Sequence, residues 1–204
     1  MIKGNFYAQF GTDRHIAEFF EEGYVGTCIE VGACDGLLVS NTLHFEQKDW
    51  TCLCIEPNKA YYNELIKNRK LSANFACGKD NVDDVEFTIF DLGGNQSAIS
   101  SLSVDERLVD SHKHLIRNSF TEKVNIRTLD TILKEFPSIA EIDFVSIDTE
   151  GTEIDVLKGF DIDRWKPKLF VMENNFEDPN ITEYLDGFGY KKIKRVGVND
   201  FYTR

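Results

Sequence analysis

The chain has 204 residues, the usual size of one domain, and 42% of them are hydrophobic, enough for a packed core. Its formal net charge of -12 argues against a nucleic-acid partner held by general electrostatic attraction. No apolar stretch approaches the roughly 20 residues of a membrane helix, and the N-terminus lacks the apolar run of a signal peptide. We therefore expect no nucleic-acid partner, no membrane partner and a cytoplasmic location.

Short apolar runs that end in turn residues predict the strands of the fold. In chain order they occupy residues 26–33, 50–57, 72–78, 85–91, 123–129, 142–149 and 167–174. Helical patterns occur at residues 12–22, 41–48, 58–70, 129–136 and 151–160. Pro57 and Asp130 suit the starts of the third and fourth of these helices. Thr152 and Gly159 suit the start and the end of the fifth.

The alternation of strands and helices, with strands that are apolar on both faces, predicts a mostly parallel sheet with helices on both faces. The last stretch, residues 188–204, departs from this alternation and reads as two strands joined by a short turn. We therefore predict a Rossmann-like α/β fold that ends in an antiparallel hairpin. A single domain over residues 1–204 is expected, with the helical segment 1–22 packed on the core.

Five cysteines are present, and their number and spacing match neither a disulfide framework nor a zinc site. They are Cys28, Cys34, Cys52, Cys54 and Cys77. Small buried side chains in a reducing compartment are the simplest explanation.

The stretch CIEVGACDG is the strongest local signal, because an apolar strand runs directly into small residues. In a doubly wound sheet, ligands bind outside the carboxyl ends of the strands, where glycines such as Gly32 and Gly36 let the backbone approach them. The GxGxxG pattern of dinucleotide binding is absent, and Asp35 would repel a pyrophosphate but not a cationic ligand. Glu56 ends the next strand, about where an acidic residue bonds the ribose hydroxyls of an adenosine.

A second concentration of acids occurs in the stretch SIDTEGTE. Asp148 ends a buried strand and Glu173 ends the next one, so the two carboxylates are expected to converge at one edge of the sheet. Glu150 lies in the turn that follows Asp148, and acids held close together raise one another's pKa. For Glu153 and Asp155 we expect only a favourable contribution to the dipole of the following helix.

Taken in order, these stretches resemble the FkbM-type S-adenosylmethionine-dependent methyltransferases. The resemblance rests on QFGTDRHIAEFF, EVGACDG, SNTLHFE, WTCLCIEPN, ACG at residues 76–78 and IDFVSIDTEGTEIDVLKGFD. It implies a class I methyltransferase fold with a mostly parallel seven-stranded sheet. It also implies transfer of the methyl of S-adenosylmethionine to a hydroxyl of a sugar or glycan, or alternatively of another small molecule such as a polyketide.

The resemblance further implies which residues contact the cofactor. They are Glu30, Gly32, Asp35, Ser40, Asn41, Glu56, Ala76 and Cys77. The sulfonium and ammonium groups of such a cofactor would explain an acidic Asp35 in the first loop, and Glu56 would hold the ribose.

A hydroxyl acceptor must lose its proton to a general base or to a metal that lowers its pKa. Asp148 or Glu150 is a candidate base. Alternatively, Asp148, Glu173 and Asn174 hold Mg²⁺, as their positions resemble those of the metal ligands in catechol-type O-methyltransferases, and Mg²⁺ prefers such oxygen ligands.

Residues 91–120 supply the remaining candidates. Gly93, Gly94 and the serines after them predict a flexible loop that forms a lid or an acceptor site. The charged segment that follows contains His112 and His114, and His114 is a further candidate base.

Two other classes of function stay open at this point. A nucleotide-binding oxidoreductase is disfavoured by the missing GxGxxG, and a non-catalytic methyltransferase-like module is disfavoured by the intact set of acids.

Overall fold

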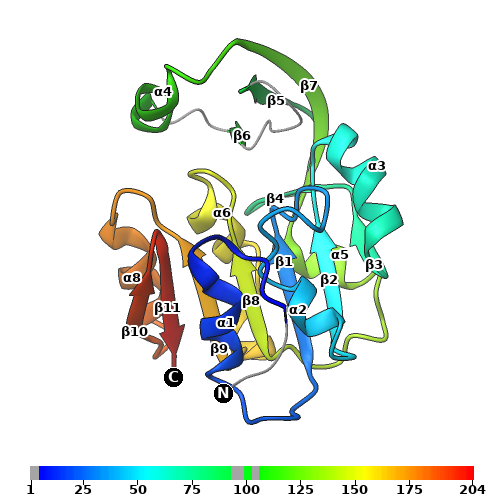
Figure 1. The fold of residues 1–204 in the computed structure, drawn as a ribbon, viewed down its shortest axis with the longest axis vertical. Coiled ribbons are helices and arrows are strands. Elements are labelled where there is room, and N and C mark those ends of the chain that lie inside the picture. Colours follow the sequence, from blue (N-terminus) through cyan, green and yellow to red (C-terminus); the bar gives the residue numbers. More distant parts are fainter. Residues whose placement is uncertain (1–4, 93–98, 103–105) are drawn as a thin grey trace.

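The computed structural model describes residues 5–92, 99–102 and 106–204, and its main element is a seven-stranded sheet (Figure 1). Across the sheet the order of the strands is β10-β11-β9-β8-β1-β2-β3. Their bounds are β1 (Thr27–Val31), β2 (Thr51–Ile55), β3 (Leu71–Ala73), β8 (Phe144–Ile147), β9 (Leu169–Glu173), β10 (Lys191–Val196) and β11 (Asn199–Thr203). The sheet is parallel from β3 through β2, β1 and β8 to β9, and β11 is antiparallel to both β9 and β10. The predicted parallel sheet with a terminal hairpin is confirmed.

Helices cover both faces of this sheet. One face packs against α5 (Leu129–Leu133), α6 (Glu153–Lys158), α7 (Ile162–Trp165) and α8 (Pro179–Asp186). The other face packs against α1 (Thr12–Ala17), which follows the short turn η1 (Gln9–Gly11), and against α2 (Leu43–Glu46) and α3 (Lys59–Asn68). Because side chains alternate along a strand, Ile29 and Val31 of β1 point to the first face, while Cys28 and Glu30 point to the second.

A second, smaller sheet lies above the carboxyl ends of the main strands (Figure 1). It has the order β4-β7-β5-β6. Its elements are β4 (Ala76–Cys77), β5 (Val82–Asp91), β6 (Ile99–Ser101) and β7 (Asn118–Arg127), and α4 (Glu106–His112) lies between the last two. Gly93 and Gly94, with most of the serine-rich loop predicted after them, lie outside the described residues.

Two predicted strands, and part of a third, belong to the second sheet and not to the main sheet. The strands predicted at residues 85–91 and 123–129 exist, but they pair antiparallel with each other and do not join the main sheet. The strand predicted at residues 72–78 divides between β3 and β4. The physical reason is visible along β5, where Phe87 and Ile89 are buried on one side while Glu86 and Thr88 between them are more exposed, as in an antiparallel sheet with one solvated face.

Two predicted helix starts are corrected by hydrogen bonds. Helix α5 is capped by Thr128, whose side chain accepts from the Thr131 N–H, while Asp130 accepts from residues of the following segment. Helix α3 is capped by Asn58, and Pro57 lies before the cap and not in the first turn. Both corrections shift the start of the helix by one residue or two, the usual uncertainty of such signals.

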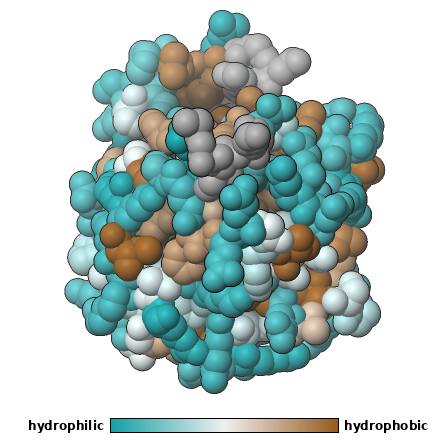
Figure 2. All heavy atoms as spheres, turned by 60° about the horizontal axis from the view of Figure 1, so that its bottom comes forward, coloured by the Kyte–Doolittle hydropathy of each residue, from teal (hydrophilic) through white to brown (hydrophobic). Residues whose placement is uncertain are grey.

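Four of the five cysteines are buried, and all five are free thiols. Figure 2 shows a face of the molecule that is mostly hydrophilic with only scattered hydrophobic residues. Within the described part of the chain, every helix is too short or too polar to cross a bilayer.

Candidate active site

A cleft opens at the carboxyl ends of β1, β2 and β8, beneath the second sheet. It encloses about 1090 Å³ of empty space, counted with its open mouth. Glu30, Glu56 and Asp148 line it from the main sheet, while Phe87 and Ser100 line it from β5 and β6. The cleft is therefore shared between the two sheets.

The floor of the cleft depends on Gly32. This residue has a φ of 85°, and a Cβ atom built there would collide with the carbonyl oxygen of Asp148. Its N–H and that of Ala33 donate to the Ile55 carbonyl, at 3.0 and 3.1 Å. Only glycine lets β1 and β8 end this close together, which brings the first loop against the acids after β8.

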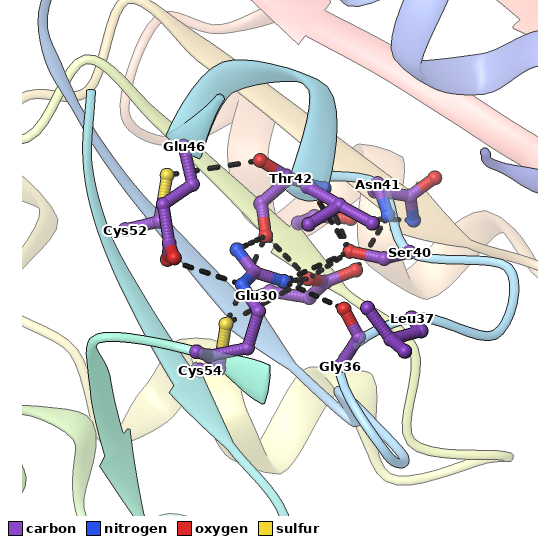
Figure 3. Close-up of polar contacts among 12 residues, drawn as sticks. Glu30, Gly36, Leu37, Ser40, Asn41, Thr42, Glu46, Cys52 and Cys54 are labelled. Atoms are coloured by element: carbon purple, nitrogen blue, oxygen red, sulfur yellow. Dashed lines mark hydrogen bonds and ion pairs between the residues drawn. The ribbon is translucent and has the colours of Figure 1, made fainter. Parts of the chain in front are cut away.

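The loop after β1 is held by Glu30, whose carboxylate is buried among hydrogen-bond donors (Figure 3). One oxygen accepts from the Ser40 hydroxyl at 2.8 Å and from the Thr42 hydroxyl, and the other accepts from the Asn41 N–H at 2.6 Å. The Asn41 amide then donates to the Ser146 hydroxyl of β8 at 3.0 Å. Glu30 thus ties the start of α2 to the end of β1.

Arg69, which follows α3, balances the charge of this region. Its guanidinium is fully buried and lies 3.5 Å from the Glu30 carboxylate and 3.1 Å from that of Glu46. It also donates to the Gly36 carbonyl at 3.1 Å and to the Thr42 hydroxyl at 2.8 Å. The sequence does not indicate this role of Arg69, because a basic residue at the end of a helix gives no sign that its side chain turns inward.

Six of the eight residues expected to contact a cofactor line the cleft. They are Glu30, Gly32, Asn41, Glu56, Ala76 and Cys77. Asp35 and Ser40 are not among the residues that line it. The Asp35 carboxylate accepts from the N–H groups of Leu37 and Leu38, at 2.9 and 2.7 Å, and so shapes its own loop. The Ser40 hydroxyl is used by Glu30 and Arg69.

Glu56 lies at the end of β2 with its carboxylate inside the cleft. One oxygen accepts from the Cys34 N–H at 2.9 Å and the other from the Asn58 N–H at 2.8 Å. Burial raises the pKa of Glu56 to about 7. Each oxygen keeps a further lone pair, so the group can accept two hydroxyls of a bound ligand.

Asp148, Glu150 and Glu173 converge at the other end of the cleft, with one oxygen of each lying within 4.8 Å of the others. Burial raises the pKa of Asp148 to about 6, although a hydrogen bond with Glu173 opposes the rise. Burial, with Asp148 and Glu153 nearby, raises the pKa of Glu150 to about 9. Burial also raises the pKa of Glu173 well above its usual range. Perturbed acids in a cleft are typical of functional sites.

The turn that presents Glu150 is organised by Glu153, the first residue of α6. Its carboxylate accepts from the Thr149 N–H, the Thr149 hydroxyl and the Gly151 N–H, each at 3.0 Å. Glu150 itself has a φ of 56°, a left-handed conformation that such a turn must stabilise. Thr152 occupies the N-cap position without a side-chain cap bond, and Gly159 is the C-cap. Glu153 therefore does more than favour the helix dipole, which corrects its expected role.

Asn174 and His114 are the remaining predicted residues. Asn174 donates to the Asp178 carbonyl and to the Asp200 carboxylate, both at 3.1 Å, and its amide oxygen accepts from the Asp178 N–H at 2.8 Å. Its amide therefore holds the next loop, while the acid that joins Asp148 and Glu173 is Glu150. His114 is exposed beyond α4 and does not line the cleft, so the structure does not support it as a base.

Ser100 was not singled out by the sequence. Its hydroxyl oxygen is buried and has no hydrogen-bond partner among the described residues, although it lines the cleft. A buried hydroxyl without a partner is unfavourable unless a ligand or water supplies one.

The fold and the cleft define the class of protein. A mostly parallel seven-stranded sheet that ends in an antiparallel hairpin, with a ligand cleft at the ends of β1 and β2, is the arrangement of a Rossmann-like methyltransferase. Residues 30–192 match the family described as the Methyltransferase FkbM domain, and the chain belongs to this family.

Two proteins of known class are similar to this chain. "Methyltransferase 1" of Beauveria bassiana is 23% identical over 163 residues, which cover 74% of this chain and 63% of that protein. The crystal structure of Methyltransferase FkbM from Methylobacillus flagellatus shares the fold, with a TM-score of 0.55 and 14% identity over 91% of this chain and 46% of that one. The chain thus spans less than two thirds of the length of either relative.

Proposed function

We propose that this chain transfers the methyl group of S-adenosylmethionine to a hydroxyl of a sugar or glycan. The observation that carries the proposal is the convergence of Asp148, Glu150 and Glu173 at one end of a cleft whose other end holds Glu56. Membership of the FkbM family supports methyl transfer as the reaction.

The cleft suits the cofactor in charge and in shape. Glu56 has lone pairs for two ribose hydroxyls, and Ala76 and Phe87 supply apolar surface for an adenine ring. The Ser100 hydroxyl, which has no partner within the described chain, would gain one from the bound nucleoside. When bound, S-adenosylmethionine supplies a methyl group on a positive sulfonium, which the surrounding carboxylates favour electrostatically.

The acids can accept the proton that the acceptor hydroxyl must lose. With its pKa at about 6, Asp148 is ionised at neutral pH and can take one proton. Glu150, with a pKa of about 9, is protonated there and can donate a hydrogen bond. In this reaction the hydroxyl oxygen forms a bond to the methyl carbon, the bond from carbon to sulfur breaks, and the proton moves to Asp148.

Titration calorimetry with S-adenosylhomocysteine tests the cofactor directly, and absence of binding would overturn the proposal. Glu56→Gln should weaken this binding by about fivefold to tenfold, because an amide replaces one acceptor of the ribose hydroxyls. Glu64→Gln, an exposed change on α3, is the matched control and should leave the affinity unchanged. A screen with radiolabelled S-adenosylmethionine across glycans and small hydroxylated compounds then identifies the acceptor.

A divalent cation is the alternative to direct base catalysis. The three carboxylates of Asp148, Glu150 and Glu173 are hard oxygen donors close enough to share one ion, as Mg²⁺ requires. Such an ion would lower the pKa of the acceptor hydroxyl and so replace the general base. Full turnover in EDTA excludes this alternative, whereas loss of turnover that Mg²⁺ restores would favour it over Asp148 as the base.

A further inference from the structure

A second cavity adjoins the cleft on the side of β9 and α8. It encloses about 710 Å³ of empty space, counted with its open mouth. Glu150 and Glu173 line both cavities, so these two acids form the partition between them, while Asp148 lines the first cleft. A group transferred from a molecule in one cavity to a molecule in the other would pass these acids.

The outer wall of this cavity is a contact between α4 and the segment that joins β9 to α8. Arg107 of α4 donates to both oxygens of Asp178, at 3.3 and 2.9 Å, in a two-pronged ion pair. The same guanidinium lies 4.2 Å from the centre of the Phe176 ring. All three side chains line the cavity. Pairing and stacking together give Arg107 a defined position, although it is about half exposed.

We propose that this second cavity is the acceptor subsite and that Arg107 closes it. The proposal deepens the proposed function and rests on it: if the cofactor fills the first cleft, the acceptor must approach the acids from the opposite side. The second cavity is the described space that reaches Glu150 and Glu173 from that side.

The lining of the cavity selects an uncharged acceptor with several hydroxyls. Asn175 and Asn180 offer amides that both donate and accept hydrogen bonds, as hydroxyl groups do. Arg107 is the one cation among the described lining residues, and it is already paired with Asp178, so an acceptor that carries a phosphate or carboxylate is disfavoured. Most lining residues are polar or charged, which also disfavours a flat apolar aromatic acceptor.

Saturation-transfer difference NMR can test the subsite before the acceptor is known. The probes are methyl glucopyranoside, methyl mannopyranoside and methyl galactopyranoside, each added to the protein with S-adenosylhomocysteine. Glucose 6-phosphate and catechol serve as the anionic and the aromatic comparison. We expect saturation transfer to at least one uncharged glycoside and weaker transfer to both comparison compounds. Absence of transfer to all three glycosides, or stronger transfer to either comparison compound, would overturn the proposal.

A pair of asparagine variants locates the binding. Asn180→Leu on α8 changes an exposed residue of the cavity wall, while Asn63→Leu makes the same exchange on exposed α3, away from both cavities. We expect the Kd of the glycoside to rise about fivefold in the first variant and to stay unchanged in the second. Arg107→Ala, which opens the outer wall of the cavity, should raise the Kd of the glycoside above its value in Asn180→Leu. Equal Kd values in wild type, Asn180→Leu and Arg107→Ala would contradict the assignment.

Failure of this inference can be told apart from failure of the proposed function. If wild-type protein does not bind S-adenosylhomocysteine, the proposed function fails. If it binds the cofactor product but no glycoside, or if the glycoside binds without regard to Asn180 and Arg107, only the acceptor subsite fails. In Glu56→Gln, weaker cofactor binding with unchanged glycoside binding would further support two separate cavities.

Discussion

Two groups of acids lie near each other at the carboxyl edge of the main sheet, and their surroundings are opposite. Glu30 and Glu46 share the buried guanidinium of Arg69, and the Glu30 carboxylate also accepts three hydrogen bonds from the loop after β1. Asp148 and Glu173 are buried beside other acids, and burial raises the pKa of both, although a hydrogen bond with Glu173 opposes the rise for Asp148. The first group has its charge balanced, and the second group is costly to ionise.

The difference indicates what each group is for. Buried charges that are paired and hydrogen-bonded hold a particular arrangement of the chain, here the loop between β1 and α2. Acids that burial makes costly to ionise lower stability, so they persist where a ligand or a reaction uses them. The Arg69 group therefore supports the fold, and under the proposed function the group of Asp148, Glu150 and Glu173 serves the reaction.

The largest expected effect comes from removing the cation of the first group. Arg69→Met should lower the free energy of unfolding by about 3–5 kcal/mol, because two carboxylates then stay buried without a partner. Urea denaturation measures this loss. Adding Glu30→Gln and Glu46→Gln to Arg69→Met removes the stranded charges and should recover part of it. A loss below about 1 kcal/mol in the single variant would show that the pairing does not support the fold.

In the second group, loss of a carboxylate should affect the reaction and not the fold. Asp148→Asn should lower turnover about a hundredfold or more, because the amide cannot take the proton of the acceptor, while affinity for S-adenosylhomocysteine stays nearly unchanged. Turnover on the acceptor found by the radiolabel screen is the measurement. Asp155→Asn on α6, whose carboxylate pairs with Lys158 at the surface, is the matched control. Equal turnover in wild type and Asp148→Asn would exclude Asp148 as the base.

A smaller effect, an increase in the free energy of unfolding, is expected when Glu150 loses its charge. Glu150 has a pKa of about 9 in the folded chain and an ordinary, lower pKa when unfolded, so the folded state binds more protons. Stability therefore falls as pH rises from about 4.5 toward 9. Glu150→Gln removes this dependence and should raise the free energy of unfolding at pH 8 by about 1–2 kcal/mol.

Denaturation at two pH values sharpens this test. At pH 5, where the folded wild type keeps Glu150 protonated, the two proteins should differ little. If Glu150→Gln is no more stable than wild type at pH 8, burial of this carboxyl does not strain the fold, and the contrast between the two groups of acids weakens.

The amino-acid sequence predicted the parts of the site that follow from local order along the chain. Asp148 and Glu173 end consecutive parallel strands, and neighbouring strands of a parallel sheet end at the same edge, so their convergence could be inferred. Gly32 and Glu56 were found in the same way, from small and acidic residues directly after apolar runs. These predictions succeed because hydrophobic periodicity and turn residues act over a few positions.

Only the tertiary structure decided how distant residues complete these patterns. Arg69 reaches Glu30 across 39 positions of the chain and Arg107 reaches Asp178 across 71, and neither arginine carries a local sign of its partner. The strands at residues 85–91 and 123–129 were detected, but their pairing into a second sheet depends on non-local contacts. Orientation is equally non-local: Asp35 lies in the loop beside the cleft, yet its carboxylate bonds its own turn. The sequence by itself determined the elements and the acids at their ends, whereas packing decided which charges are balanced and which stay available for chemistry.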